Sequence, residues 1–174
     1  DNLIQFSVDH NLIGLEWAGG LPGTVGAGVR GNVGAFGGEI KDSIEKVDVL
    51  DYSTNTPIFK TLSNEDLQFV YRGSVVKSNK KMVVLSAYLR LKKASAEEIQ
   101  IAQKIYNKNQ QFRKDHHPLE YPNCGSVFKN IRDKEKIAKV LSIYPDLAES
   151  VEKRGYGKVA VASLIEKLGL KGYW

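Results

Sequence analysis

Glycine is concentrated in one short stretch of this chain. Ten of the 16 glycines lie between Gly14 and Gly38, in the run GLEWAGGLPGTVGAGVRGNVGAFGG. Glycine lets the backbone adopt positive φ and lets another surface approach the peptide plane, although it destabilises a helix by roughly 0.5–1 kcal/mol per position. We expect a loop system with one short helix whose backbone contacts a ligand; tight turns and bulges in a β domain are the alternative. The segment contains no G-x-x-x-x-G-K-[ST], which excludes a P-loop. It is not the usual dinucleotide fingerprint either, because no hydrophobic strand leads straight into a G-x-G-x-x-G and no helix of normal propensity follows.

The composition excludes several classes of protein. The single cysteine, Cys124, cannot form a disulfide within the chain, and the three histidines make no cluster at zinc-ligand spacing. No stretch approaches the ~20 apolar residues that span a bilayer, and residues 1–3 do not begin a leader peptide. We expect a soluble chain with no membrane segment. Because it starts with Asp1 rather than Met, we also expect it to be a piece of a longer protein.

Charge is unevenly distributed along the chain. The 25 Lys and Arg residues exceed the 20 Asp and Glu residues by five, and residues 1–40 hold four acids and one Arg, so the excess lies in the remainder. Such a balance suits a nucleic acid, an acidic lipid surface or a phosphorylated small molecule, and a solvated lysine-rich surface is the alternative. The basic residues are scattered and no stacking aromatic residues are interleaved with them. We therefore expect no nucleic-acid partner and no membrane partner.

Alternating apolar residues predict strands in the first half of the chain. Residues 44–49 alternate with period two, and residues 57–62 return after the turn-forming residues 53–56, which predicts a hairpin. Residues 82–91 are the clearest strand. One face of this strand is expected to carry Val83, Leu85, Ala87, Leu89 and Leu91. The first half is therefore expected to be mostly β.

The pattern changes near residue 93, where we place a domain boundary. Ser95 and Glu98 have the spacing of a capping box, which opens a helical stretch. Its apolar residues at helical spacing are Ile99, Ala102, Ile105 and Tyr106. Residues 137–144 predict another helix, and Pro145 suits the first turn of the next one.

A last helix is predicted near the end of the chain. Residues 163–166 have the spacing of a second capping box, and Gly169 is expected to end the helix that it opens. The second half is therefore expected to be α+β with short helices.

Two polar side chains could carry chemistry, each with a structural alternative. Arg72, within residues 71–74, offers a bidentate fork for carboxylate or phosphate, but it also suits a surface loop. Ser126 follows a turn built on Pro122 and Gly125, and is either a catalytic group or a turn-forming residue. Structural roles are favoured for His116, His117 and Cys124 and for the amphipathic helix at residues 164–172.

Four motifs, taken in order, resemble the UDP-N-acetylenolpyruvoylglucosamine reductase (MurB) family of bacterial peptidoglycan synthesis. The family typically has a G-[IL]-P-G-x-V-G-G run that ends in N-x-G-A-Y-G-G-E, then Y-R-x-S, then P-x-x-G-S-x-F-K-N-P, then L-I-E-x-x-G-L-K-G. Here the corresponding segments are residues 20–39, 71–74, 122–130 and 164–172. One motif arises easily by chance, but four in order make a strong resemblance over nearly the whole chain.

The resemblance implies an FAD-dependent reductase. In the family, NADPH reduces the flavin, and the enolpyruvyl ether of UDP-N-acetylglucosamine then takes up a hydride and a proton to give UDP-N-acetylmuramate. Arg72 matches the family Arg that stabilises an enolate-like intermediate, and Ser126 matches the family Ser that donates the proton. The implied partners are the UDP-sugar and NADPH, in a cytoplasmic bacterial enzyme of cell-wall biosynthesis.

The resemblance also implies binding residues. Those that match the flavin-binding segment are Leu21, Pro22, Gly23, Gly26, Ala27, Asn32, Gly34 and Ala35. Those that match substrate-binding positions are Tyr71, Phe36, Lys129 and Asn130. The chain departs from the family pattern in having Phe36 for the usual Tyr, Ala27 for the second Gly of V-G-G, and Ile131 for the Pro after F-K-N. No metal ligand is implied.

The resemblance implies an α+β fold. It also implies that the sequence contains parts of two domains. Residues 1–93 match the second subdomain of a VAO/PCMH-type FAD-binding domain, and residues 94–174 match a partial MurB C-terminal substrate-binding α+β domain. Residues 131–158 are expected to be an inserted helical pair. The first flavin subdomain and a C-terminal catalytic Glu are expected outside this sequence. The alternatives are another flavin oxidoreductase of the same superfamily, or a non-catalytic remnant of a MurB-like protein.

Overall fold

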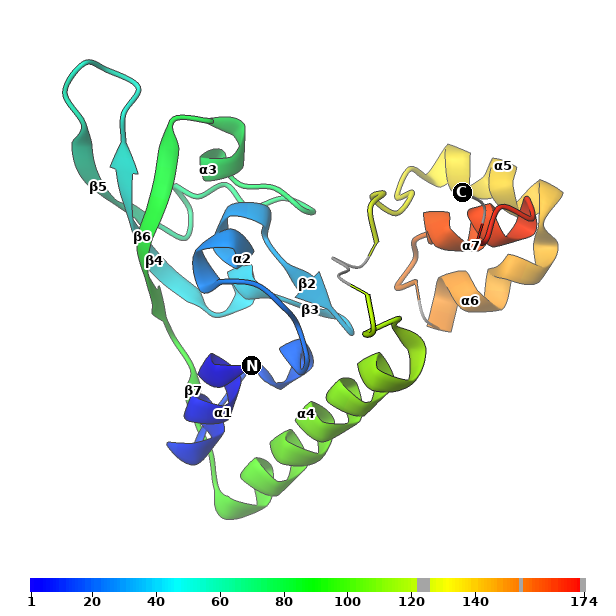
Figure 1. The fold of residues 1–174 in the computed structure, drawn as a ribbon, viewed down its shortest axis with the longest axis horizontal. Helices are drawn as coiled ribbons and strands as arrows, with labels where there is room; N and C mark the ends of the chain where they lie inside the picture. The colour runs from blue at the N-terminus through cyan, green and yellow to red at the C-terminus, as the bar shows by residue number, and fades with distance from the viewer. Residues whose placement is uncertain (122–125, 154, 173–174) are drawn as a thin grey trace. The chain divides into compact units, whose positions relative to one another are not determined.

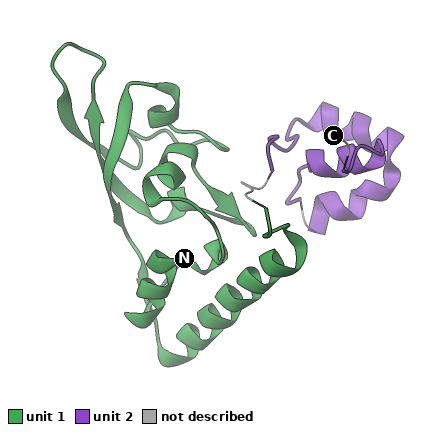
Figure 2. Ribbon diagram, in the orientation of Figure 1, with its two compact units in different colours: residues 1–121 green, residues 122–174 purple. Residues whose placement is uncertain are grey.

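The structure, a computed structural model, describes residues 1–121, 126–153 and 155–172. It divides into two compact units, residues 1–121 and residues 122–174 (Figure 2). This division lies later than the boundary expected near residue 93, because helix α4 (Ala96–His116) packs within the first unit. The assignment of flavin-binding and substrate-binding domains to residues 1–93 and 94–174 stays a prediction.

The first unit is built around a three-stranded antiparallel sheet. Strand β4 (Ile44–Asp51) lies between β5 (Ile58–Ser63) and β6 (Met82–Leu89) (Figure 1). The hairpin predicted from residues 44–62 and the strand predicted at residues 82–91 are both confirmed. One face of the sheet covers the main core, whose fully buried members include Val29, Val47, Val49, Leu67 and Val76.

Strand β6 presents different residues to the core from those predicted. Its register with β4 shifts between Asp48 and Val49, so Leu85 is left as an extra residue opposite them. This bulge turns Val83 and Leu85 outward, where 46% and 50% of their surfaces are exposed. Val84 packs against the core instead. The predicted face is therefore wrong in its first half, because strict alternation fails at a bulge.

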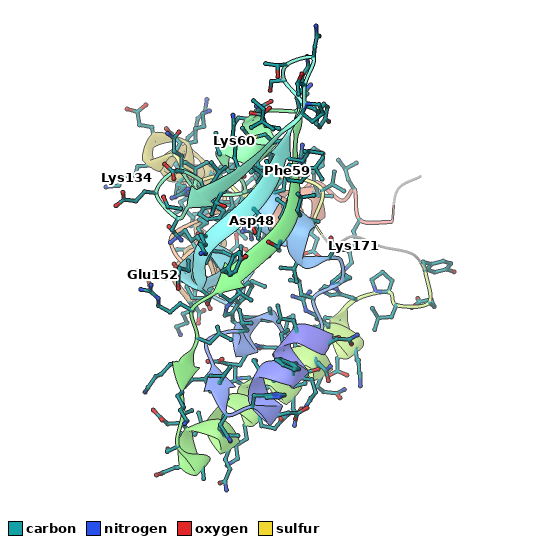
Figure 3. The ribbon with its side chains drawn as sticks, turned by 90° about the vertical axis from the view of Figure 1, so that its left-hand side faces the viewer. Asp48, Phe59, Lys60, Lys134, Glu152 and Lys171 are labelled. Carbon is teal, nitrogen blue, oxygen red and sulfur yellow. The ribbon has the colours of Figure 1, made fainter. Side chains whose placement is uncertain are left out.

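The rest of the predicted face is correct. Ala87 and Leu89 pack against the main core, and Leu91 packs against a second cluster. The opposite face of the sheet carries Asp48 on β4 and Phe59 on β5 (Figure 3). Phe59 is 76% exposed, so this outer face is partly apolar.

The glycine-rich segment folds as turns around one α-helix. It contains the 3-10 turn η1 (Glu16–Ala18), helix α2 (Val25–Gly31), and the two-residue strands β2 (Gly34–Ala35) and β3 (Gly38–Glu39). The hydroxyl of Thr24 caps α2, because it accepts a hydrogen bond from the Ala27 N–H at 3.2 Å. The predicted loop system with one short helix is confirmed.

Two helices far apart in the sequence form a second core in the first unit. Helix α1 (Asn2–Asp9), which the sequence patterns do not predict, contributes Ile4. Helix α4 begins with the predicted capping box of Ser95 and Glu98, and it contributes the buried Tyr106. The short elements that complete this unit are β1 (Leu12–Ile13), η2 (Ile40–Asp42), α3 (Val75–Ser78) and β7 (Lys92–Lys93), with β1 paired to β7.

The described part of the second unit is helical. It comprises α5 (Lys134–Ile143), η3 (Pro145–Leu147), α6 (Ala148–Lys153) and α7 (Val161–Lys167). Among its described residues the only β feature is an isolated bridge between Ile131 and Val159, so the expected α+β character is not seen there. The helices predicted at residues 137–144 and from Pro145 are confirmed.

Two expectations about helices in the second half are corrected. The capping box predicted at residues 163–166 is wrong, because α7 begins at Val161 after Ala160 and Ser163 lies inside it. Gly169 does follow this helix, with φ +70°, as a helix C-terminus favours. Helix α4 is not short, since it has 21 residues.

In the part of the chain that the structure describes, no helix is both long and apolar enough to cross a bilayer. The same residues contain no group of three His, Cys, Asp or Glu side chains that could hold a metal ion.

Candidate functional site

The tip of the glycine-rich segment is a tight hairpin. Ala35 pairs with Gly38, and the two residues between them, Phe36 and Gly37, have φ values of +48° and +88°. Positive φ at both central residues is typical of a type I′ turn. Phe36 thus adopts a left-handed conformation that non-glycine residues seldom take, and the turn presents its side chain at the hairpin tip.

A second tight loop carries Arg72. Val70 and Gly73 donate backbone hydrogen bonds to each other's carbonyls at 3.1 and 3.0 Å, which leaves Tyr71 and Arg72 as the two central residues. Arg72 has φ +56°. The ammonium group of Lys77 donates to the Arg72 carbonyl at 2.8 Å and holds this conformation.

The side chain of Arg72 lies against the base of the hairpin. Its Nη1 donates to the Asn32 carbonyl at 3.3 Å, and its Nη2 donates to the Gly34 carbonyl. The Nη1 atom also lies 3.8 Å from Oε1 of Glu39, and the guanidinium lies 4.9 Å from the centre of the Tyr71 ring. The side chain remains 32% exposed. A fixed but accessible guanidinium can bind a carboxylate or stabilise developing negative charge.

Asn32 is fully buried beneath this arrangement. It ends α2 with φ +44° and ψ +64°. Its side-chain amide donates to Glu39 Oε2 at 3.1 Å and to the Val70 carbonyl at 3.0 Å, while its oxygen accepts from the Lys41 N–H at 3.3 Å. Because its exposed fraction is 0% and its polar atoms have protein partners, the predicted flavin contact does not fit its side chain.

A cavity of about 210 Å³ lies beside α2. Four of the residues that match the flavin-binding segment line it: Leu21, Pro22, Gly23 and Ala27. The other four, Gly26, Asn32, Gly34 and Ala35, are not among its lining residues. Most of the walls are apolar and were not predicted from the sequence; they include Leu3, Ile4, Leu15, Trp17, Val33 and Ile40. These residues have an apolar pattern that also fits a core, so no sequence signal sets them apart.

The close packing of the glycine run has two causes. A Cβ atom on Gly38 would lie 2.3 Å from the Trp17 ring, and one on Gly34 would lie 2.6 Å from the Gly38 carbonyl. The protein itself therefore requires these two glycines. Gly23, by contrast, has φ +107°, with no atom within 4 Å of its Cβ position, and it lines the cavity. The turns and close packing of the protein itself thus explain these glycines, and a ligand against the backbone of this run stays a prediction.

The hairpin tip contacts the end of helix α4. Phe36 packs edge-on to Phe112, with ring centres 5.5 Å apart, and lies 5.3 Å from the guanidinium of Arg113. Arg113 also donates from Nε to the Gly19 carbonyl at 2.9 Å, and burial lowers the pKa of its guanidinium. His116 stacks on Phe112 at 4.1 Å. The helix thus steadies the loop that carries Phe36.

The remaining predicted site residues lie in the second unit. Ser126 and Lys129 are exposed, and Asn130 is half-buried. Asn130 lines a small cavity of about 80 Å³ together with Lys158. The turn predicted at Pro122, Cys124 and Gly125 lies outside the described residues. Arg72 belongs to the first unit, so the two predicted catalytic residues come from different units.

Known reductases match most of this chain. It is 44% identical over 120 residues, 69% of its length, to UDP-N-acetylenolpyruvoylglucosamine reductase from Caldanaerobacter subterraneus subsp. tengcongensis, and spans 37% of that protein. It is 48% identical over 121 residues, 70% of its length, to the reductase of Caldicellulosiruptor bescii, again spanning 37%. It is 39% identical over 165 residues, 95% of its length, to the reductase of Caldicellulosiruptor saccharolyticus, spanning 44%.

The chain therefore spans less than half the length of these relatives. No protein-family model matches it. Among solved structures, it resembles the crystal structure of UDP-N-acetylenolpyruvylglucosamine reductase (MurB) from Thermus caldophilus, with a TM-score of 0.59 and 27% identity. This likeness covers 81% of the chain and 50% of that structure. The sequence comparison and the mixed α+β fold thus point to the same reductase.

Proposed function

This chain belongs to the UDP-N-acetylenolpyruvoylglucosamine reductase (MurB) family, and from that membership we propose its function. The protein reduces the enolpyruvyl ether of UDP-N-acetylglucosamine to UDP-N-acetylmuramate, in peptidoglycan precursor synthesis. FAD is its bound cofactor and NADPH its reductant. The proposal includes a location in the bacterial cytoplasm, where NADPH is kept reduced.

Arg72 has the properties that the reaction requires. Bound FAD, once reduced, would supply a hydride to the terminal carbon of the vinyl group. Negative charge then develops on the adjacent carbon and its carboxylate, and preorganised positive charge stabilises it. The guanidinium of Arg72 is held by two backbone carbonyls while 32% of the side chain stays exposed. This fixed, accessible cation is the observation that carries the proposal.

Ser126 is assigned the proton that completes the reduction. The hydride and the proton together saturate the double bond, so a donor must deliver a proton to carbon. A serine hydroxyl is a weak acid, and it depends on its position and on a strongly basic carbon acceptor. Ser126 is exposed, which is compatible with access to a substrate.

The 210 Å³ cavity fits part of the cofactor. Ligand pockets usually measure about 300–1,000 Å³, so this cavity suits one ring system and not a whole FAD. Its walls are mostly apolar, which suits a flat aromatic ring, and Gly23 is among the residues that line it. We assign flavin contact to Leu21, Pro22, Gly23 and Ala27, and UDP-sugar contact to Tyr71, Phe36, Lys129 and Asn130.

Two substitutions in the full-length protein test the proposal. Arg72→Ala and Ser126→Ala should each lower turnover of the UDP-sugar by roughly 10²–10⁴-fold, the usual size of such effects. NADPH should still bleach the flavin absorbance in both variants, because neither residue is assigned to that step. Unchanged turnover in Ser126→Ala would refute the assignment of the proton donor.

A further inference from the structure

We propose that Asn32 and Glu39 are positioning residues for Arg72. They fix where its guanidinium sits without contacting substrate. The inference rests on the proposed function only in treating Arg72 as a catalytic residue; the contacts themselves all lie within the first unit. The family resemblance implies a flavin contact for Asn32 and no role for Glu39.

The guanidinium is held by acceptors from one short segment. The Asn32 carbonyl, the Gly34 carbonyl and the Glu39 carboxylate surround it, and all three belong to residues 32–39. A guanidinium has five N–H donors, and the two carbonyls take two of them. Among the described residues, the other contact to a polar group is the ion pair with Glu39, so part of the fork stays available to an anionic ligand.

Glu39 is itself held in one orientation. Its Oε2 accepts from the Asn32 amide at 3.1 Å, while its Oε1 lies 3.8 Å from Arg72 Nη1. Lys41 lies 3.9 Å from Oε2, and the carboxylate also caps η2. Because the carboxylate is 23% exposed and tied at both oxygens, it offers Arg72 a fixed counter-charge.

Asn32 connects the hairpin to the loop of Arg72. One amide hydrogen goes to Glu39 and the other to the carbonyl of Val70, which begins the two-residue loop. Within that loop Arg72 has φ +56°, a conformation that costs a non-glycine residue about 1–3 kcal/mol and persists only where neighbouring contacts enforce it. Asn32 therefore restrains both the backbone and, through Glu39, the side chain of Arg72.

Neither residue needs to touch substrate for this role. Asn32 is 0% exposed, so its side chain cannot reach a ligand in the surrounding solvent. A substitution of Asn32 must therefore affect the reaction through neighbouring groups, and Arg72 is the neighbour to which a catalytic role is assigned. A displacement of a catalytic group by about 1 Å can lower a rate by about 10²-fold.

A double-mutant cycle in the full-length holoenzyme tests the proposal. Glu39→Gln, which preserves shape and removes charge, should lower kcat for UDP-sugar reduction by roughly tenfold to a hundredfold. In an Arg72→Ala background the same substitution should change kcat by less than about twofold, because there is no guanidinium left to position. Asn32→Asp, which replaces the amide donors by acceptors, should behave in the same way. Glu45→Gln is the matched control, since it breaks the exposed Glu45–Arg90 pair at 3.2 Å and should leave kcat unchanged.

A second readout needs no turnover. In nitrogen-15 NMR spectra of the full-length protein, the Arg72 guanidinium protons should exchange slowly in the wild type and faster in Glu39→Gln and Asn32→Asp. If these protons respond as expected but the UDP-sugar is not reduced, the positioning role stands and the proposed function fails. If the exchange is unchanged, or if Glu39→Gln lowers kcat equally with and without Arg72, the positioning role is overturned.

Discussion

The carbonyl of Gly34 accepts a hydrogen bond from Nη2 of Arg72, and a Cβ atom at Gly34 would lie 2.9 Å from Nη1 of the same guanidinium. It would also lie 2.6 Å from the Gly38 carbonyl. Gly34→Ala should therefore push Arg72 from its place and lower the free energy of unfolding by about 1–3 kcal/mol, the usual cost of overpacking. Chemical denaturation gives the stability change, and UDP-sugar turnover gives the effect on Arg72.

Gly31→Ala is the matched control for this prediction. Gly31 is the last residue of α2, and no atom lies within 4 Å of its Cβ position. Alanine favours a helix over glycine by up to about 1 kcal/mol, so this variant should be as stable as the wild type or slightly more stable. Equal destabilisation by the two substitutions would contradict the close approach at Gly34.

Filling the cavity beside α2 should weaken flavin binding. Ala27 is exposed and lines the cavity, so Ala27→Phe should occupy much of its volume. We expect flavin affinity in the full-length protein to fall at least about tenfold, which corresponds to about 1.4 kcal/mol. Stability should change by no more than about 0.5 kcal/mol, as is usual for surface positions. Flavin fluorescence titration measures the affinity.

Ala96→Phe serves as the control for the cavity prediction. Ala96 is exposed at the start of α4 and lies outside the cavity lining. Flavin affinity should be unchanged in this variant. If Ala27→Phe binds flavin as tightly as Ala96→Phe does, the cavity is not part of the cofactor site.

The ion pair of Asp51 and Lys60 predicts a pH dependence of stability. The ammonium of Lys60, which is labelled in Figure 3, donates a hydrogen bond to Asp51 at 2.7 Å. This bond and the hydrogen bonds from Ser53 lower the pKa of Asp51 from 3.8 to about 2. A carboxylate whose pKa is lower in the folded state than in the unfolded state stabilises the fold at pH values above its unfolded-state pKa. This stabilisation is lost as the pH falls through the folded-state pKa. The contribution should be constant above about pH 5 and disappear between about pH 4 and pH 2.

Asp51→Asn provides the comparison for this pH dependence. The difference in unfolding free energy between the wild type and Asp51→Asn, measured by denaturation at several pH values, should shrink over that acidic range. A difference that stays constant down to pH 2 would show that the ionised Asp51 does not stabilise the fold.

Tyr106 tests whether α4 belongs to the first unit. It is 6% exposed and packs with Ile4, Leu15 and Ala18, so Tyr106→Ala should lower the free energy of unfolding by about 3–5 kcal/mol. Trp17 fluorescence, in a Trp174→Phe background, reports unfolding of the first unit. Ile105→Ala on the same helix is the control. Because Ile105 is 39% exposed, this substitution should lower the free energy of unfolding much less. A domain boundary at residue 93 with an independent α4 predicts no effect on Trp17.

Local sequence patterns predicted the elements that are determined by interactions between residues close together in the chain. The capping box of Ser95 and Glu98 forms as expected, because both partners lie on the same helical turn. The bulge at Leu85 could not be predicted, since it depends on how β6 pairs with β4. The second capping box does not form, because α7 begins at Val161, two residues before Ser163, and its N-cap is Ala160, which makes no side-chain cap hydrogen bond.

The candidate site was predicted by resemblance, but its internal contacts were not. The family motifs identify Arg72 and half of the cavity-lining residues of the flavin segment. They do not show that Asn32 is buried or that Glu39 faces Arg72, because those contacts join residues 33 to 40 positions apart and depend on two left-handed residues. Asparagine tolerates left-handed φ better than most residues, and that tolerance was the available signal for Asn32.

Anaerobic reoxidation of the flavin tests the central claim most directly. The full-length protein is reduced with NADPH and mixed with UDP-N-acetylglucosamine enolpyruvate, and flavin absorbance is followed with product formation. We predict reoxidation at a rate on the order of 1–10³ s⁻¹, the common range for enzymes, with one UDP-N-acetylmuramate formed per flavin. A flavin that oxygen reoxidises quickly and the UDP-sugar does not, or a protein that retains no flavin, would contradict the account.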